Sequence, residues 1–393
     1  MSRVIVLTGG GSGGHITPLL AVADELKQHD AATRVIYIGQ RGDKLGDIPA
    51  KHASIDETFT VHAGKFRRYH GEGLRQLIDV PTHLKNFRDA FYVLAGIVES
   101  YRLLKRLQPD VIFVKGGFVG VPVGLAASRL KLPYVTHDSD AIPGLANRII
   151  ARHAAKHAVA LPAEVYPYPS AKTVTTGIPL RAEFQPVTEA LKRQYRQEIA
   201  LPLDAQLLFI IGGGLGAQRV NHAVLSVAPH LLKEFAHLHI IHVVGRNNET
   251  EVTQAYEGAL TDDERLRVRV MGFVEDVYRY SGAADVVVTR AGATNLAEFA
   301  LQTKACIVIP SAFLTGGHQL KNAQYLADKQ AVIVLTDDEL NRDPNRLAVQ
   351  VSRLLQTPKE RQSLAQNLHS FAHRDAAQQL VALLETTAGE RKE

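Results

Sequence analysis

Cysteine and tryptophan are almost missing from this sequence of 393 residues, and their scarcity excludes certain proteins and sites. The single cysteine, Cys306, cannot form a disulfide within the chain, which excludes a disulfide scaffold and is typical of a reducing compartment. It lies in the apolar run of residues 305–309, so we predict a small core residue and not a nucleophile. Tryptophan is absent and aromatic residues make up 6% of the chain, so we do not expect a carbohydrate site lined by many aromatic rings.

Long hydrophobic segments are also absent. No window approaches the ~20 apolar residues that a membrane-spanning helix needs, and the apolar run at residues 4–7 is too short for the core of a signal peptide. We therefore expect a cytosolic or peripheral protein. The formal charge of +5 and the pI near 9.1 permit anionic partners but are too weak to indicate nucleic-acid binding.

Short apolar runs alternate with longer amphipathic stretches along the chain, which is typical of βαβ units around parallel sheets. The expected strands lie at residues 3–8, 34–39, 111–115, 134–136, 157–160, 206–211, 239–244, 267–271, 285–289, 305–310 and 331–335. The rhythm breaks at residues 162–169, where three prolines suit an interdomain connection. Because 393 residues exceed what one hydrophobic core usually serves, we predict an α/β fold of two Rossmann-like domains facing each other across a cleft. The predicted segments are 1–162, 171–357 and C-terminal helices at 358–393.

The first expected strand runs into a loop with five glycines among residues 9–14, followed by a helix that we expect to begin near Thr17 and Pro18. Glycines let the backbone approach a ligand, and the helix start presents N–H groups to negative charge. A nicotinamide-binding turn fits less well, because the spacing differs and residues 38–41 offer no acidic side chain. His15 follows the glycines directly, and its imidazole is a candidate general base.

The second half opens in the same way, because the expected strand at 206–211 runs into a second glycine loop at residues 212–216. We predict that this loop and the following helix start bind a diphosphate. Arg290 follows a later strand, and Glu298, several residues into the next helix, is suited to accept hydrogen bonds from both hydroxyls of a ribose. Arg290 is alternatively a structural ion-pair partner.

A further cluster follows the strand at 305–310. His318, Gln319 and Asn322 are residue types that hydrogen-bond to sugar hydroxyls, and they occur together at the start of the next expected helix. Each one alone is as consistent with an ordinary surface residue, so the prediction depends on the cluster.

Basic and apolar residues alternate in residues 65–88, a composition that suits docking on an anionic lipid surface. The alternative is a solvated loop followed by a helix that faces the core. The predicted membrane residues are Phe66, Arg67, Arg68, Leu74, Arg75, Leu77, Ile78, Lys85, Phe87 and Arg88.

Eight motifs in this order resemble the MurG family of UDP-N-acetylglucosamine transferases, which convert lipid I to lipid II in peptidoglycan synthesis. The motifs lie at residues 10–15, 115–122, 137–147, 177–181, 213–217, 271–274, 290–298 and 318–323. The resemblance implies a GT-B fold with the acceptor in the N-terminal domain, UDP-N-acetylglucosamine in the C-terminal domain, and a C-terminal helix that crosses back to the N-terminal domain. It also implies inversion of the anomeric centre, no metal or other cofactor, and a peripheral location on the cytoplasmic face of the cell membrane. The implied partners are the sugar nucleotide, the lipid-linked acceptor and an anionic membrane, with other cell-wall synthesis enzymes as candidates.

The same resemblance assigns site residues. In this assignment Glu298 holds the uridine ribose, Phe273 lies along the uracil, Arg181 faces the phosphates and Gln319 touches the sugar hydroxyls. The implied donor-binding residues are Arg181, Gly213, Gly214, Leu215, Gly216, Ala217, Phe273, Arg290, Ala293, Glu298, His318, Gln319 and Asn322. The implied acceptor-binding residues are Ser12, Gly13, Gly14, His15, Gly117, His137, Asp140 and Asn147.

Two motifs depart from the family pattern. The chain has His137-Asp138-Ser139-Asp140 where members usually have His-Glu-Gln-Asn, and His318-Gln319 where they usually have Gln-Gln. Asp138 and Asp140 are therefore competing candidates for the base beside His15. They also match an Asp-x-Asp pattern, but they fall in the first half, so we assign them to the acceptor side and expect no metal site.

Three other functions stay open from the sequence. These are a UDP-sugar transferase that acts on a different lipid acceptor, a UDP-N-acetylglucosamine 2-epimerase, and a non-catalytic binding subunit.

Overall fold

The computed structural model describes residues 3–11, 13–65, 80–213, 216–312 and 317–390, and only the backbone for residues 80–85. The chain divides into two units, which are Met1–Ala182 with His373–Glu393 (unit 1) and Glu183–Ala372 (unit 2). We expected boundaries at residues 162, 171 and 357, whereas the two units meet after Ala182 and after Ala372. The proline-rich stretch does not leave unit 1, because β7 (Thr173–Thr175) follows it and pairs with the sheet of that unit. Helix α16 (Pro358–His369) belongs to unit 2.

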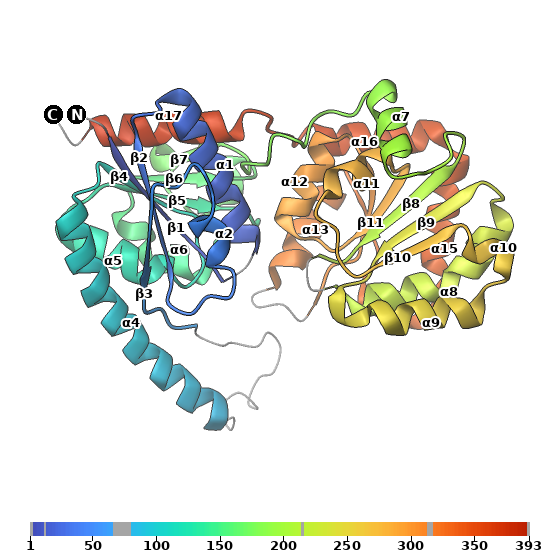
Figure 1. Cartoon of the computed structure of the whole chain (residues 1–393), viewed down its shortest axis with the longest axis horizontal. Coiled ribbons are helices and arrows are strands. Elements are labelled where there is room, and N and C mark those ends of the chain that lie inside the picture. The colour runs from blue at the N-terminus through green and yellow to red at the C-terminus, as the bar shows by residue number, and fades with distance from the viewer. Residues whose placement is uncertain (1–2, 12, 66–79, 214–215, 313–316, 391–393) are drawn as a thin grey trace. The chain divides into compact units, whose positions relative to one another are not determined.

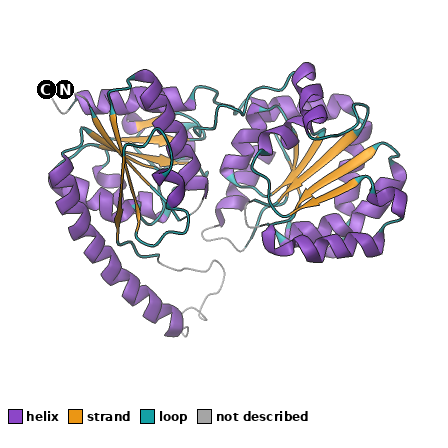
Figure 2. Cartoon of the chain, in the orientation of Figure 1, coloured by secondary structure: helices purple, strands orange, loops and turns teal. Residues whose placement is uncertain are grey.

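Unit 1 is built on a parallel sheet of seven strands in the order β3-β2-β1-β4-β5-β6-β7 (Figures 1 and 2). Its other strands are β1 (Val4–Thr8), β2 (Arg34–Gln40), β3 (Glu57–Val61), β4 (Val111–Val114), β5 (Tyr134–Asp138) and β6 (Lys156–Val159). Its helices are α1 (Gly13–His29), α2 (Asp47–Ala50), α4 (Val80–Leu107), α5 (Gly120–Leu130), α6 (Leu145–Ile150) and α17 (Ala376–Gly389), with short 3-10 turns η1 (Ala151–His153), η2 (Ala163–Val165) and η3 (Ser170–Lys172).

Side chains alternate across this sheet, so each face has its own core. Ile5 and Leu7 of β1 pack with α1 and α17, whereas Val6 packs on the opposite face with residues of α5. Leu380 and Leu384 of α17 are fully buried in the first of these clusters. The expected return of the C-terminal helix to the N-terminal domain is thus confirmed.

Helix α1 begins four residues earlier than the expected cap at Thr17. Gly13, Gly14 and His15 lie in its first turn, and Pro18 lies inside the helix. Thr17 does not cap the helix, because its hydroxyl donates to the carbonyl oxygen of Gly13, one turn back (3.1 Å). Because glycine has a low helix propensity, Gly13 and Gly14 favoured a helix that starts after them. In the structure they form the N-terminus of α1.

Unit 2 has a parallel sheet of six strands in the order β10-β9-β8-β11-β12-β13. The strands are β8 (Gln206–Ile211), β9 (Leu238–Val243), β10 (Val268–Met271), β11 (Val286–Thr289), β12 (Ala305–Val308) and β13 (Ile333–Val334). Its helices, besides α16 and the 3-10 turn η4 (Arg246–Asn248), are α7 (Glu189–Glu198), α8 (Gln218–Glu234), α9 (Glu249–Ala259), α10 (Asp262–Arg265), α11 (Val277–Ala283), α12 (Ala293–Leu301), α13 (His318–Asp328), α14 (Asp337–Arg342) and α15 (Asn345–Gln356).

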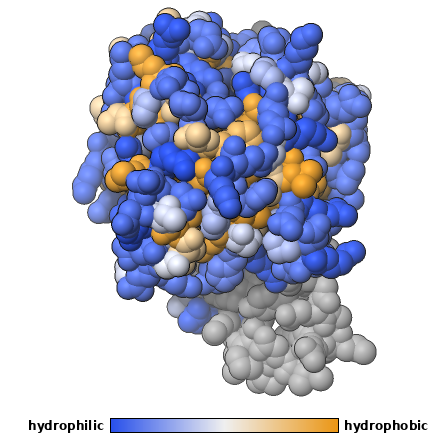
Figure 3. Space-filling view, turned by 90° about the vertical axis from the view of Figure 1, so that its right-hand side faces the viewer, coloured by the Kyte–Doolittle hydropathy of each residue, from blue (hydrophilic) through white to orange (hydrophobic). Residues whose placement is uncertain are grey.

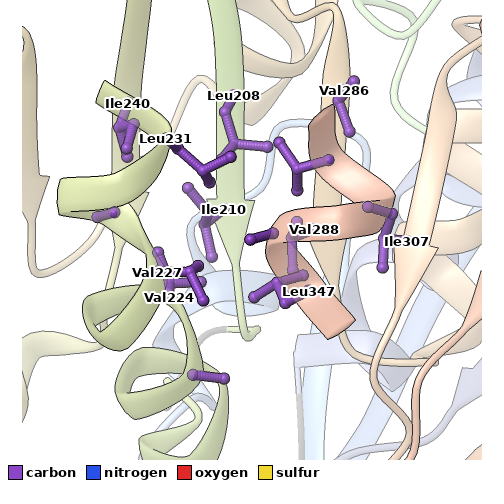
Figure 4. Packing of buried hydrophobic residues seen from close by; sticks show 14 of the residues in the cluster. Leu208, Ile210, Val224, Val227, Leu231, Ile240, Val286, Val288, Ile307 and Leu347 are labelled. Carbon is purple, nitrogen blue, oxygen red and sulfur yellow. The ribbon is translucent and has the colours of Figure 1, made fainter. Parts of the chain in front are cut away.

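Two apolar layers cover this second sheet. Figure 4 shows Leu208 and Ile210 of β8 between Leu231 of α8 and Leu347 of α15. The opposite layer contains Cys306, which is fully buried and whose thiol pKa is raised by that burial. The prediction that the lone cysteine is a core residue is confirmed. The outer surface of unit 2 mixes hydrophilic residues with scattered apolar ones (Figure 3).

The strand order fixes where each unit can hold a ligand. In both sheets the order reverses beside the first strand, between β1 and β4 in unit 1 and between β8 and β11 in unit 2. Open parallel sheets bind ligands at the carboxyl ends of the strands flanking such a point. Both glycine loops start there. Among the described residues, no helix is both long and apolar enough to cross a membrane.

Candidate active site

The glycine loop of unit 1 is held by the side chains that surround it. The Tyr37 hydroxyl donates to the carbonyl oxygen of Gly9 (2.6 Å), and the amide of Gly11 donates to Asp43 (3.1 Å). A tyrosine and an aspartate from the neighbouring strand region therefore fix the turn between β1 and α1. Ser12, a predicted acceptor residue, lies outside the described residues.

His15 is half-buried in the first turn of α1, with its Nδ1 atom 3.1 Å from the carbonyl oxygen of Gly10. A carbonyl can only accept, so Nδ1 carries the proton and the lone pair of the neutral ring is on Nε2. Gly117 lies against the same imidazole, because a Cβ on Gly117 would be 2.9 Å from the Gly10 oxygen and 3.3 Å from Nδ1. Gly117 also has φ +77°, so a side chain is doubly excluded there.

His137 is the penultimate residue of β5, which is buried along its whole length, and it is almost inaccessible to solvent. Its Nε2–H donates to the carbonyl oxygen of Gly177 (2.8 Å), while Nδ1 has no hydrogen-bond partner among the described residues. Burial, and then the charge of Lys115, hold the pKa of His137 well below its usual range. The ring is therefore neutral and keeps a buried lone pair.

Asp138 is buried and already accepts three hydrogen bonds. Its donors are the Gly144 amide (3.1 Å), the Asn147 side-chain amide (2.9 Å) and the Tyr168 hydroxyl (2.7 Å). Burial raises the pKa of Asp138, and these hydrogen bonds oppose that effect. The carboxylate thus fastens the loop between β5 and α6.

Asn147 and Asp140 complete this loop. Asn147 is buried and donates to the carbonyl oxygen of His137 (2.9 Å) as well as to Asp138, while its own Oδ1 has no partner among the described residues. Asp140 is half-buried two residues beyond the end of β5. Asn147 is thus held beside His137 at the carboxyl edge of the sheet, and Asp140 lies in the loop between them along the chain.

The sequence reasoning missed Lys115 as a site residue. It follows β4 directly, only 2% of it is exposed, and its Nζ donates to the Ser139 hydroxyl (2.6 Å). Burial lowers its pKa to about 8, although Asp140 and Asp138 act in the opposite direction. A lone lysine between an apolar run and two glycines was the signal that could have found it.

The glycine loop of unit 2 depends on backbone conformations that favour glycine. Gly213 and Gly216 have φ values of +95° and +76°. A Cβ on Gly216 would lie 2.1 Å from the carbonyl oxygen of Val244, so the loop packs on the end of β9. Ala217 immediately precedes α8. Gly214 and Leu215 lie outside the described residues.

Phe273 follows β10, is 39% exposed, and carries a cation on one ring face. The Arg246 guanidinium lies 4.1 Å from the ring centroid. Arg246 follows Gly245, whose Cα would be 2.9 Å from a Cβ on Gly216. A cation–π contact between Arg246 and Phe273 therefore adjoins the glycine loop. The sequence reasoning missed Arg246, and the Gly-Arg pair after a buried strand was its only signal.

Arg290 forms the structural ion pair that was the alternative interpretation. Its Nη1 donates to the Asp337 carboxylate (3.0 Å) and to the carbonyl oxygen of Ile309 (2.9 Å), and both ion-pair side chains are buried. The residue thus connects the ends of β11 and β12 to the start of α14. This geometry supports a positioning role for Arg290 rather than the direct donor contact that we predicted.

The remaining predicted residues of unit 2 lie on two helices, α12 and α13. Ala293 is the first residue of α12, and Glu298 is half-buried in the middle of that helix. Gln319 is buried and accepts from the amide of Ser311 (2.9 Å), and Asn322 donates to the carbonyl oxygen of Ala291 (3.1 Å). His318 begins α13 and is half-buried, and Arg181 is half-buried near the end of the first stretch of unit 1.

Most of the predicted membrane residues fall on undescribed parts of the chain. Phe66, Arg67, Arg68, Leu74, Arg75, Leu77 and Ile78 lie outside the described residues, as does the side chain of Lys85. Phe87 and Arg88 are exposed on α4. No group of three or more His, Cys, Asp or Glu residues in the described ranges is arranged to hold a metal ion.

Comparison with known proteins identifies the family. The glycosyltransferase family 28 N-terminal domain matches residues 5–159, and the C-terminal domain of that family matches residues 207–380. A relative from Geotalea daltonii, a UDP-N-acetylglucosamine--N-acetylmuramyl-(pentapeptide) pyrophosphoryl-undecaprenol N-acetylglucosamine transferase, is 33% identical over 379 residues, 96% of each chain. The chain belongs to the MurG family of glycosyltransferases. A second such transferase, from Lachnospira eligens, is 33% identical, and the match covers 90% of that relative.

Solved structures show the fold that this MurG-family chain shares. MurG from Acinetobacter baumannii has a TM-score of 0.74 at 24% identity, with 98% of this chain and 99% of that one covered. A putative UDP-N-acetylglucosamine 2-epimerase from Listeria monocytogenes has a TM-score of 0.68 at 11% identity, with 99% and 98% covered. The expected GT-B fold of two Rossmann-like domains is confirmed.

Proposed function

We propose that this protein transfers N-acetylglucosamine from UDP-N-acetylglucosamine to lipid I, the undecaprenyl-pyrophosphoryl N-acetylmuramyl-peptide, and so forms lipid II for peptidoglycan. One observation carries the proposal above the others. The chain is 33% identical, over 96% of both chains, to a transferase named for this reaction. That relatedness spans both units, so it includes both glycine loops and all the motifs that follow the strands.

The reaction is a single displacement with inversion. An acceptor hydroxyl attacks C1 of the sugar, the new oxygen–C1 bond forms, and the bond between C1 and the β-phosphate oxygen breaks. UDP leaves with the bonding electrons, and the hydroxyl proton passes to a base. Charge grows on the β-phosphate, so backbone N–H groups at the start of α8 and the Arg181 guanidinium are proposed to stabilise it. The reaction as proposed needs no metal ion.

His15 is the proposed base. Its Nδ1–H donates to Gly10, which places the lone pair on Nε2, where a proton can be accepted. Asp138 suits the role less, because both of its carboxylate oxygens already accept hydrogen bonds within unit 1. Asp140 remains the competing candidate.

Donor binding is assigned to unit 2. Residues 213–217 are proposed to approach the diphosphate, Glu298 to accept from the ribose hydroxyls and Phe273 to lie along the uracil. The positive φ values of Gly213 and Gly216 support the first assignment, because they allow the backbone to lie close to a phosphate. Gln319 is held by the Ser311 amide, so its orientation toward the sugar hydroxyls would be fixed before the donor binds.

The decisive experiment incubates purified protein with UDP-N-acetylglucosamine and measures UDP release with and without a lipid I analogue. We expect release only when the lipid acceptor is present, together with a disaccharide product. Conversion to UDP-N-acetylmannosamine without any acceptor would instead indicate a 2-epimerase. Transfer to a different lipid but not to the lipid I analogue would overturn the acceptor assignment. Replacing Glu298 with Ala should raise the donor KM, and an unchanged donor KM would contradict its placement.

Helix α4 supports the proposed peripheral association with the cytoplasmic face of an anionic membrane. Phe87, Phe91, Leu94 and Val98 recur at a helical spacing and are between 49% and 66% exposed. They form one apolar stripe on α4, because positions 4, 7 and 11 residues apart share a helix face. The opposite face is buried in unit 1 through Gly96 and other residues. In Figure 1, α4 extends past the sheet of unit 1.

Basic residues adjoin this α4 stripe. Arg88 lies over the Tyr92 ring (5.5 Å), and Arg102, Lys105 and Arg106 are exposed further along the helix. An exposed apolar stripe beside cations combines insertion with attraction to anionic headgroups.

Vesicle co-sedimentation tests the membrane proposal. We expect the wild type to bind vesicles of anionic phospholipid better than neutral ones, and salt to weaken this binding. Replacing Phe91 and Leu94 with serine should reduce binding, whereas the matched change Leu266→Ser, at an 83% exposed leucine of unit 2, should not. Equal binding to both vesicle types, or equal loss in the control, would contradict the proposal.

A further inference from the structure

Lys115 occupies the point of unit 1 where the strand order reverses. It directly follows β4, and its amide donates to the carbonyl oxygen of Thr8 on β1 (2.9 Å), which extends the β1–β4 ladder to the carboxyl edge. The next two residues, Gly116 and Gly117, have φ values of +104° and +77°. The lysine is therefore the last side chain of the ladder before the turn beside His15.

A buried lysine requires a compensating partner, because transfer of an ammonium group from water is costly. Lys115 is 2% exposed, and the Ser139 hydroxyl is the one hydrogen-bond partner of its Nζ within the described residues. Lys304, the other lysine that is buried among the described residues, donates to two backbone carbonyl oxygens, those of Gly282 (2.7 Å) and Ala284 (3.2 Å). Lys304 thus has an ordinary structural role, whereas Lys115 is directed at a single hydroxyl that follows β5.

The direction of the Lys115–Ser139 hydrogen bond fixes what Ser139 can do. An ammonium group only donates, so the Ser139 oxygen accepts from it and the hydroxyl proton points elsewhere. Ser139 is half-buried in the loop that also carries His137 and Asp140. A hydroxyl whose oxygen is held by a cation is a stronger donor, since the positive charge polarises the O–H bond.

We propose that Lys115 is a positioning residue for the acceptor, which holds Ser139 so that the serine hydroxyl donates a hydrogen bond to a negatively charged oxygen of the lipid-linked substrate. This inference rests on the proposed function. The ligand chemistry is a phosphate or carboxylate oxygen, because a polarised hydroxyl donates most strongly to a charged acceptor. The ammonium charge itself is opposed by Asp138 and Asp140, which also act on it. Asp138 cannot take this role, because a carboxylate only accepts hydrogen bonds, as Asp138 does from Gly144, Asn147 and Tyr168.

The charge on Lys115 gives the proposal a pH signature. Its pKa is lowered to about 8 by burial, against the attraction of Asp140 and Asp138. Lys115 also acts on His137, whose ring is neutral. On the side of the loop after β1, Gly9 packs against the Cβ of Lys115. Acceptor binding should therefore weaken as pH rises past about 8, where the ammonium group loses its proton.

Steady-state kinetics with a lipid I analogue tests this on the full-length protein. Lys115→Met and Ser139→Ala should each raise the acceptor KM by about tenfold or more, the size typical of a hydrogen bond to a charged group. The donor KM should change by less than about twofold. Because Lys115 acts through Ser139, the double variant should be no worse than Lys115→Met alone. The fall of kcat/KM for the acceptor above pH 8 should disappear in both single variants.

Lys304→Met is the matched control, because it also removes a buried ammonium group but belongs to unit 2, whereas the proposed site belongs to unit 1. We expect lower thermal stability and an unchanged acceptor KM. If Lys115→Met does not fold, Ser139→Ala carries the test alone, since the lysine and its charge remain. Three results would overturn the inference. The first is a double variant whose increase in acceptor KM equals the product of the two single effects. The others are a raised donor KM in place of a raised acceptor KM, and a fall of kcat/KM above pH 8 that persists in both single variants. A wild type that transfers sugar to no lipid acceptor would instead reject the proposed function.

Discussion

Replacing Arg290 with leucine separates a structural role from a donor-binding role. The residue is 47 positions from Asp337 in sequence, yet the two side chains form an ion pair at 3.0 Å and are 11% and 4% exposed. Removing one partner of a buried pair costs ~3–5 kcal/mol, because the other charge is left uncompensated. Here Arg219 still contacts the Asp337 carboxylate at 3.3 Å from a more exposed position. We therefore expect the lower part of that range, ~3–4 kcal/mol.

Thermal unfolding is the direct assay for this prediction. A domain of 150–250 residues loses roughly 2–4 °C per kcal/mol, so the melting temperature of unit 2 should fall by roughly 5–15 °C. Asp337→Leu should cost a similar amount, and the double variant should cost less than the sum of the two. The control is Arg265→Leu, which breaks an exposed pair with Asp262 and should cost less than ~1 kcal/mol.

The donor KM decides between the two roles. If Arg290 positions the loops after β11 and β12, Asp337→Leu should raise the donor KM as much as Arg290→Leu does. The structural assignment would be refuted if Arg290→Leu left the melting temperature unchanged but raised the donor KM, and Asp337→Leu did not raise it. Arg290 would then contact the donor directly.

Three further predictions follow from single residues. Gly216→Ala places a Cβ 2.1 Å from the Val244 oxygen at φ +76°, so we expect destabilisation by more than ~1 kcal/mol and a raised donor KM. Gly258→Ala, which meets open space in α9, should not destabilise the protein and should leave the donor KM unchanged. His15→Gln should lower kcat by about 10²–10⁴-fold with little change in donor KM, and a retained kcat would place the base elsewhere. Burial lowers the pKa of His242 to about 3, so between pH 6.5 and 3 only the unfolded chain binds this proton and acid destabilises the protein. The stability advantage of wild type over His242→Gln should therefore shrink by about 2 kcal/mol between pH 7.5 and 5, measured by denaturant unfolding.

The central strands could be read from the sequence because each is a buried apolar run that ends in glycine or a polar residue. The expected strand at 206–211 coincides with β8, and that at 34–39 is one residue shorter than β2. The strands β3 and β7 were missed. Both lie at sheet edges, where one side has no neighbour, so threonine and glutamate replace the apolar run. Missing β7 also misplaced the boundary between the two units.

For the candidate site, the sequence predicted which positions along the chain contribute residues, but not which side chains contact each other. Residues that directly follow parallel strands meet at one edge of a sheet, but it was the resemblance to the MurG family that assigned roles to His137 and Phe273. The contacts could not be predicted, because the carbonyl oxygen of Gly177 is 40 residues from His137 and the Ser139 hydroxyl is 24 residues from Lys115. Such pairings depend on how neighbouring loops pack, and no local pattern encodes them.

The two carboxyl edges use different chemistry, and this difference bears on one departure from the family pattern. Unit 2 presents glycine backbone and an Arg–Phe cation–π contact, whereas unit 1 presents side chains held by each other. Asp138 accepts from Gly144, Asn147 and Tyr168 at distances of 2.7–3.1 Å. A glutamate there is longer by one methylene, so its carboxylate would meet these three donors from a different position. The three hydrogen bonds give the aspartate a role inside unit 1. Acceptor choice is better tested at Ser139 and Asp140, which are only half-buried.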